Sequence, residues 1–233
     1  MPPHTIAMTP WILVDSAQVP GTSEELQLYK RCDEFSIKLK GRGELMCSRV
    51  HGSEVALAEL GCSRLTAHSA ARVLIGGLGM GFTLAATLQQ LGASAEVVVA
   101  ELVPAVVEWN RGPLADLAGR PLTDARVTVR IGDVARILTA ERQAYDAILL
   151  DVDNGPEGLT RKDNDWLYAV DGLAASFAAL RPLGVLAVWS AGPDRHFAER
   201  MRKVGFDVEE TRVRAHASRR GAQHTIWLAG RPV

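Results

Sequence analysis

The sequence has few of the residues and segments that mark several classes of protein. Cysteine occurs three times in 233 residues, as Cys32, Cys47 and Cys62, and no two have CxxC spacing. This pattern favours neither a disulfide framework nor a zinc site, so we expect reduced thiols. No apolar run reaches the length of about 18 residues that spans a bilayer. The N-terminal stretch lacks both the basic and the apolar region of a signal peptide, so we expect a cytoplasmic protein.

Charge of one sign is also lacking. The formal net charge is −1, so no general attraction to nucleic acid or to an anionic membrane is expected. The histidines, cysteines and carboxylates show no metal-ligand spacing, and we predict no metal. The composition, 47% hydrophobic and 23% charged, is that of an ordinary globular protein.

Two kinds of pattern divide the chain. Short, partly alternating runs between residues 11 and 50, broken by Pro20-Gly21 and by Gly41-Arg-Gly43, predict a small antiparallel sheet of hairpins. From Ser53, a plausible N-cap, the spacing becomes helical. We therefore expect a β-hairpin domain over residues 1–52 and a second domain over residues 53–233.

The second region alternates apolar strands with helices. Five strand-like runs begin at "RVLIGG" and end at "GVLAVWS", and each is followed by a helical segment. Such a series predicts a doubly wound, mostly parallel sheet covered on both faces. The last two strand-like runs, "DVEETRVRAH" and "QHTIWLAG", predict a closing hairpin. The expected fold is thus α/β, Rossmann-like, with the seven-stranded arrangement of class I methyltransferases.

A glycine-rich loop follows the first of these strands. In "VLIGGLGMGF", Gly77, Gly79 and Gly81 occupy every second position, with Leu78 between them. Ligands of doubly wound sheets bind at the carboxyl ends of strands, where glycine lets the backbone approach them closely. A purely structural turn is the alternative interpretation.

Two acids follow the next two strands. Glu101, followed by Leu102, ends the second strand and is placed to accept hydrogen bonds from ribose hydroxyls, unless it is simply a solvated acid. Asp133, followed by Val134, is placed to accept from an adenine amino group, to cap a helix, or to do both. Loop and acids together predict an adenosyl ligand. No second phosphate-binding half for NAD is apparent, so S-adenosylmethionine or its decarboxylated form fits better.

With these motifs, the sequence resembles the spermidine synthase-like (polyamine aminopropyltransferase) branch of the class I methyltransferase superfamily. The resemblance rests on "GGLGMG", "VVVAELVPAVVE", "RVTVRIGDV" and "YDAILLDVDNGPEGL". It implies that Asp151 is the catalytic residue, accepting a proton or hydrogen bond from an attacking amine. It also implies a homodimer formed through the N-terminal hairpins.

The sequence departs from this family at the substrate pocket. The second Asp of the family's Asp-x-x-Asp is Asn154 here, with Asp153 beside it. The acid that binds the amine of decarboxylated S-adenosylmethionine aligns with Gly79. The family's Tyr-His segment is replaced by "ELMCSRVHGSE", in which His51 and Glu54 loosely match the same wall.

The remaining candidate residues lie near the strand ends. Asp151 ends a very apolar strand, which favours a raised pKa and a general base, although a loop-ordering role is the alternative. Asp153 and Asn154 are candidates for holding the acceptor, with Asp153 a second catalytic candidate. Trp189 and His51 are predicted to line the acceptor site, unless they are structural. Further aromatic and acid–base candidates are Trp166, Tyr168, Ser190 and His224.

We expect a transferase that binds S-adenosylmethionine and moves its methyl or another sulfonium-linked group to a small nucleophile. The alternative is an aminopropyltransferase that uses decarboxylated S-adenosylmethionine and a polyamine, and a second alternative is a non-catalytic protein with a nucleotide-binding fold. An aminopropyltransferase needs two or more carboxylates around its pocket. Near the predicted site, the sequence offers Asp151, Asp153 and Glu157.

Overall fold

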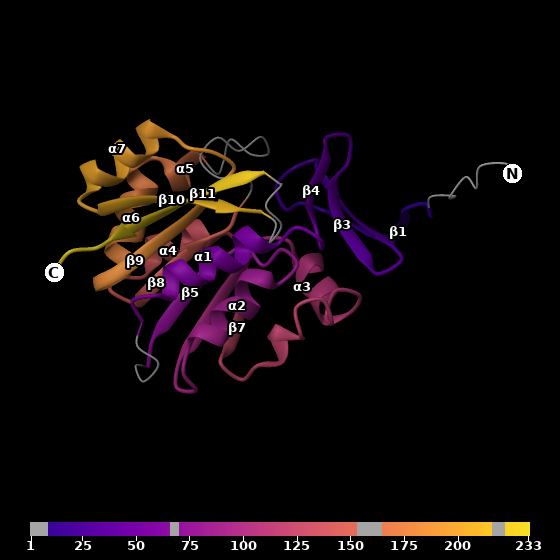
Figure 1. Cartoon of the computed structure of the whole chain (residues 1–233), viewed down its shortest axis with the longest axis horizontal. Coiled ribbons are helices and arrows are strands. Elements are labelled where there is room, and N and C mark those ends of the chain that lie inside the picture. The colour runs from indigo at the N-terminus through magenta and orange to yellow at the C-terminus, as the bar shows by residue number, and fades with distance from the viewer. Residues whose placement is uncertain (1–8, 66–69, 153–164, 216–221) are drawn as a thin grey trace, which may run out of the picture. The chain divides into compact units, whose positions relative to one another are not determined.

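The chain forms two compact units, residues 1–49 and residues 50–233, in a computed structural model. The structure describes residues 9–65, 70–152, 165–215 and 222–233 (Figure 1). No helix in these ranges is both long and apolar enough to cross a membrane.

The first unit is a four-stranded antiparallel sheet in the order β1-β2-β3-β4. Its strands are β1 (Ile12–Gln18), β2 (Glu25–Arg31), β3 (Glu34–Leu39) and β4 (Gly43–Cys47). The predicted hairpins are confirmed, because each strand pairs with the next along the chain. On β1 the apolar residues Ile12, Leu13 and Val14 are exposed.

The second unit is built on a seven-stranded sheet in the order β10-β11-β9-β8-β5-β6-β7. The strands from β5 to β9 are parallel, and β11 is antiparallel to both β9 and β10. The predicted α/β fold with a closing hairpin is therefore confirmed. The strands are β5 (Arg72–Gly76), β6 (Glu96–Glu101), β7 (Val127–Ile131), β8 (Tyr145–Leu150), β9 (Leu180–Ser190), β10 (Asp207–Arg214) and β11 (Gln223–Gly230).

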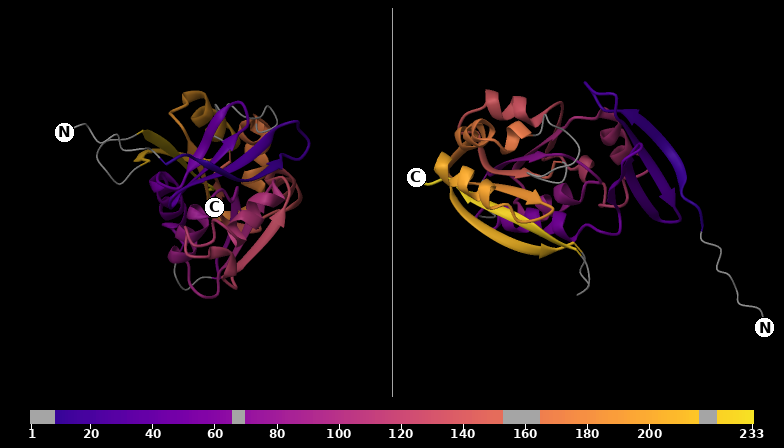
Figure 2. Two further views of the ribbon diagram at one scale, coloured as in Figure 1. Left: turned by 90° about the vertical axis from the view of Figure 1, so that its right-hand side faces the viewer. Right: turned by 90° about the horizontal axis from the view of Figure 1, so that it is seen from above.

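Helices lie on both sides of this sheet, as the two views of Figure 2 show. On one face α4, α6 and α7 pack over alternate buried residues of the strands, including Ile148 and Val188. On the other face α1 packs closely, and a Cβ on Gly61 would lie 2.3 Å from Leu149 Cδ2. The helices are α1 (Gly52–Cys62), α2 (Phe82–Gln90), α3 (Pro104–Arg111), α4 (Val134–Ala140), α5 (Asp165–Tyr168), α6 (Val170–Ala179) and α7 (Arg195–Val204), with a 3-10 turn at Pro121–Thr123.

Two details differ from the sequence prediction. Helix α1 has His51, not Ser53, as its N-cap residue, so Ser53 lies inside the first turn. Helix α5 and the turn at Pro121–Thr123 were not predicted, because such short elements carry little periodic signal.

Candidate active site

The glycine loop connects β5 to α2 at the carboxyl edge of the sheet. Gly77, Gly79 and Gly81 all have positive φ angles, of +90°, +53° and +85°. A Cβ on Gly77 would lie 2.5 Å from the carbonyl oxygen of Asp151, so only glycine fits between the loop and the end of β8. The loop thus brings the predicted glycines and Asp151 together.

Glu101 holds this loop from the neighbouring strand. Its buried carboxylate accepts hydrogen bonds from the backbone N–H of Leu78 at 2.9 Å and from that of Val103 at 2.8 Å. A carboxylate oxygen has two lone pairs, so a side chain of this kind can accept from a ligand hydroxyl as well as from the backbone. Leu102 follows it and is partly buried.

Asp133 lies at the end of the next strand, where it caps α4. Its carboxylate accepts from the backbone N–H of Ala135 at 2.8 Å, and the side chain is exposed. The helix-capping interpretation is therefore confirmed, and the adenine contact stays a prediction. Val134 is buried and its side chain packs beside Gly76, under the start of the glycine loop.

The carboxyl of Asp151 lies next to α1 and α2. Thr83 of α2 donates a hydrogen bond to it at 2.7 Å. Burial raises the pKa of Asp151, and the bond from Thr83 acts in the opposite direction. A raised pKa was predicted from the apolar strand "AILLD".

A second carboxyl, that of Glu54, joins Asp151 from the first turn of α1. Burial first, and then the charge of Asp151, raise the pKa of Glu54 well above its ordinary value. Among the described residues, no basic side chain contributes to lowering the pKa of either carboxyl. The sequence analysis noted Glu54 only as part of a loosely matched wall, because its pairing with Asp151 depends on how α1 docks on the sheet.

Two of the predicted acceptor-site residues, His51 and Trp189, lie on elements that adjoin this carboxyl pair. His51 stacks on Phe82, the first residue of α2, with ring centroids 4.1 Å apart and an interplanar angle of 13°. Trp189 at the end of β9 packs edge-on against His224 of β11, with centroids 4.6 Å apart. Asp153 and Asn154, predicted as catalytic and substrate-binding residues, lie outside the described residues, as does Glu157.

Three other predicted residues have structural partners. Tyr168 is buried and donates from its hydroxyl to the carbonyl of Val152 at 2.9 Å. Ser190 bonds the backbone of Gly192. Trp166 lines a groove beside α4 with Ala135 and its helical neighbours.

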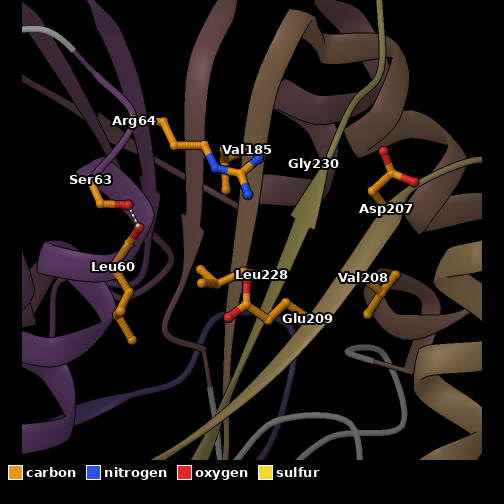
Figure 3. A pocket seen from close by; sticks show the side chains of 9 residues that line it. All are labelled: Leu60, Ser63, Arg64, Val185, Asp207, Val208, Glu209, Leu228 and Gly230. Carbon is orange, nitrogen blue, oxygen red and sulfur yellow. Dashed lines mark hydrogen bonds between the residues drawn. The ribbon is translucent and has the colours of Figure 1, made fainter.

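A separate cavity of 310 Å³ opens at the opposite edge of the sheet (Figure 3). It lies between the C-terminal end of α1, the start of β10 and the end of β11. Its lining includes the exposed side chains of Arg64, Asp207 and Glu209 over Val185 and Leu228. Because the glycine loop and Asp151 follow the carboxyl ends of their strands, this cavity is not part of the candidate active site.

In residues 9–65, 70–152, 165–215 and 222–233, no group of three or more His, Cys, Asp or Glu side chains is placed to hold a metal ion.

Comparison with known proteins gives matches in sequence and in structure. No protein-family model matches the chain. A polyamine aminopropyltransferase of Mycobacterium tuberculosis is 28% identical over 173 residues, which is 73% of this chain and 31% of that protein. The polyamine aminopropyltransferase of Mycobacterium bovis matches with the same values. The chain thus spans about a third of the length of these curated relatives, 31% in each.

The structural matches cover nearly the whole chain. A spermidine synthase in complex with the transition-state analogue AdoDATO superposes with a TM-score of 0.73 at 18% identity, over 95% of this chain and 73% of the other. The spermidine synthase from Thermotoga maritima gives a TM-score of 0.74 with the same identity and coverage. These matches show the fold.

The comparisons bear differently on the two transfer reactions. They do not support methyl transfer, which was the main hypothesis from the sequence, and they favour its alternative, aminopropyl transfer. The predicted resemblance is confirmed: in sequence and in fold, the chain resembles the spermidine synthase-like branch of the class I methyltransferase superfamily.

Proposed function

We propose that this chain is an aminopropyltransferase of the spermidine synthase type, which moves an aminopropyl group from decarboxylated S-adenosylmethionine to an amine. The observation that carries the proposal is the carboxyl pair of Glu54 and Asp151 beside the glycine loop. Two partly buried carboxyls side by side favour a cation, because a positive charge relieves their mutual repulsion. Glu54 thus supplies from α1 the second acid that an aminopropyltransferase needs.

The same pair argues for the decarboxylated donor. S-adenosylmethionine carries a carboxylate on its tail, and no described basic side chain near Glu54 and Asp151 offsets their charge. A third carboxylate would be repelled there, whereas the aminopropyl tail carries only positive charge. The family's acid that binds the donor amine is replaced by Gly79 here, and in this proposal Glu54 supplies the missing negative charge.

In this proposal the chain works by alignment and by proton acceptance. The acceptor nitrogen forms a bond to the carbon next to the sulfonium, the carbon–sulfur bond breaks with its electron pair going to sulfur, and Asp151 takes the proton from nitrogen. Thr83 orients the Asp151 carboxylate through its hydrogen bond. The adenosyl part of the donor is held by the glycine loop and by residues of the adjoining strand ends, namely Gly77, Leu78, Gly79, Gly81, Glu101, Leu102, Asp133 and Val134.

Calorimetric titration with S-adenosylmethionine, its decarboxylated form and methylthioadenosine tests the donor directly. We expect the decarboxylated form to bind at least about tenfold more tightly than S-adenosylmethionine, a difference of about 1.4 kcal/mol. The Glu54→Gln variant should lose most of this preference. Glu59→Gln, an exposed substitution on the same helix, is the matched control and should keep it.

The outcomes separate the three hypotheses. Tighter binding of S-adenosylmethionine than of its decarboxylated form would support methyl transfer and refute the proposal. Absence of binding by all three ligands would favour the non-catalytic protein. Binding of the decarboxylated form without transfer to any amine would leave the donor assignment standing and refute the reaction.

The proposal includes a homodimer formed through the hairpin unit. The support from this unit is strand β1, an edge strand on which Ile12 and Leu13 expose 64% and 49% of their surface. Exposed apolar edge strands tend to pair with another chain. Light scattering of the wild type and of a Leu13→Lys variant tests this, and a monomeric wild type would contradict it.

A further inference from the structure

Three polar side chains form a group next to the carboxyl pair. His224, near the start of β11, shares a hydrogen bond of 2.9 Å between its Nδ1 and the Oγ of Ser53. Trp189 packs edge-on against the imidazole at an interplanar angle of 70°. Ser53 is buried in the first turn of α1, so the group joins this helix to β9 and β11.

The group is uncharged but rich in hydrogen-bonding capacity. Burial lowers the pKa of His224, and no described carboxylate acts against this, so the imidazole is neutral at pH 7. The Nδ1 atom is engaged by Ser53, while Nε2 has no partner among the described residues. The indole Nε1 of Trp189 is buried and likewise has no acceptor within the described part of the chain. Such a buried donor calls for a partner.

A second contact docks the start of α1 besides the bond between Ser53 and His224. The backbone N–H of Gly52 already donates to the carbonyl of Ala215 at 2.9 Å, which fastens the start of α1 to the end of β10. A Cβ on Gly52 would lie 2.9 Å from that same oxygen, so the contact is close. The ring of His224 is therefore oriented by Ser53 in addition to a docking contact that exists without it.

The uncharged group and the carboxyl pair are close neighbours. Ser53 and Glu54 are consecutive in the first turn of α1, and Asp151 and Trp189 directly follow Leu150 and Val188, which pair with each other between β8 and β9. The site therefore has an acidic end at Glu54 and Asp151 and a neutral end at His224 and Trp189. A molecule that spanned both ends would meet carboxyls at one end and uncharged hydrogen-bonding groups at the other.

From this arrangement we infer that the acceptor is a short primary amine whose other end is an uncharged polar group, such as a hydroxyl or an amide, rather than a second ammonium. The inference rests on the proposed aminopropyl transfer. A hydroxyl both donates and accepts hydrogen bonds, so it can accept from the Trp189 indole and pair with His224 Nε2. An ammonium can only donate, and it would lack a carboxylate at this end among the described residues. His224 is thus assigned as a specificity residue for the acceptor.

The test compares three acceptors of equal chain length: 4-amino-1-butanol, 1,4-diaminobutane and butylamine. With decarboxylated S-adenosylmethionine as donor, kcat/KM should be about tenfold higher for the amino alcohol than for either of the others. His224→Asp places a carboxylate at the neutral end and should reverse the preference towards the diamine. His224→Asn keeps a polar atom near the position of Nδ1, and so the bond to Ser53, but removes Nε2. It should raise KM for the amino alcohol without changing the affinity for methylthioadenosine.

Two further measurements distinguish recognition from a structural role. Melting temperatures show whether a variant has lost its fold, and His224→Gln, which places a polar atom near Nε2, should restore part of the preference for the amino alcohol. Nitrogen-15 spectra of histidine-labelled wild type report on His224 without turnover, and its signals should shift with the amino alcohol but not with butylamine.

A wild-type preference for the diamine, or an unmoved His224 signal, overturns the inference. If the donor binds and none of the three amines is modified, the proposed reaction fails, and the spectra still decide whether His224 binds the amino alcohol.

Discussion

Replacing Glu101 with glutamine separates a function that the structure shows for this carboxylate from one that we propose for it. Glu101 accepts from the N–H of Leu78 in the glycine loop and from that of Val103, and we propose that it also accepts from the ribose hydroxyls of the donor. Glutamine keeps one oxygen but presents an NH₂ group where the second oxygen was. One buried backbone N–H then faces the NH₂ group of glutamine and has lost its hydrogen-bond acceptor.

The cost can be worked from these contacts. Hydrogen bonds to charged groups contribute about 1.5–3 kcal/mol each, so Glu101→Gln should lower the free energy of unfolding by about 2–3 kcal/mol. For a domain of this size that corresponds to a fall of about 4–12 °C in melting temperature. Glu101→Ala leaves both N–H groups unpaired and should cost about 3–6 kcal/mol, which makes it the less informative variant.

The ligand effect is measured separately, by titration with methylthioadenosine at a temperature where the variant is folded. This ligand carries the ribose but not the transferred tail. Loss of a charged acceptor to a ribose hydroxyl should raise its Kd by about 10–100-fold. Glu96→Gln, an exposed substitution at the start of the same strand, is the control. It should change neither the free energy of unfolding nor the free energy of methylthioadenosine binding by more than about 1 kcal/mol. An unchanged Kd for Glu101→Gln would refute the ribose assignment, and an unchanged melting temperature would refute the loop-holding function.

Three further predictions concern packing, backbone strain and pH. Gly61→Ala should lower the free energy of unfolding by about 1–2 kcal/mol in urea titrations, because the new Cβ would meet buried Leu149 at 2.3 Å. Leu183→Asn should raise it by about 0.5–1 kcal/mol, since Leu183 is exposed with a φ of +68° and asparagine tolerates this conformation better. The raised pKa values of Glu54 and Asp151 contribute stability that is present below their ordinary pKa values of 4.5 and 3.8 and is lost as pH rises through the raised values. The wild type should therefore lose stability relative to Glu54→Gln as pH rises from 4 to 7, and parallel curves would contradict the pairing.

The proposed donor half of the site is the part most open to prediction from sequence. The glycines follow β5, Glu101 ends β6 and Asp133 lies just after β7, and parallel strands bring their carboxyl ends to one edge. Local sequence therefore gives both their identity and their position. What it could not give is the reason for Gly77, because the carbonyl of Asp151 that excludes a side chain there comes from a different strand.

Helix α1 shows the opposite case. Ser53 is predicted as an N-cap from its place before a helical run, yet the helix begins at Gly52, two residues earlier than that cap implies, and the Ser53 hydroxyl meets His224 of β11. Glu54 carried no motif strong enough to make it a site residue. The contact of Ser53 with His224 and the pairing of Glu54 with Asp151 both depend on which strands α1 packs against. Helical periodicity indicates only that one face of the helix is buried.

The acceptor is hard to predict from sequence for the same physical reason. Its neutral end is assembled from α1, β9 and β11, and each contributes a single side chain with a common structural use elsewhere in proteins. In the proposed reaction the donor is bound by a loop whose glycines are conspicuous in the sequence. The proposed acceptor site consists of Ser53, Trp189 and His224, which are brought together only by their mutual contacts. A scaffold of this kind can keep its donor while a few side chains on separate elements change the acceptor. The closing hairpin and the first turn of α1 are therefore where differences in substrate between this chain and the polyamine aminopropyltransferases that it resembles should be sought.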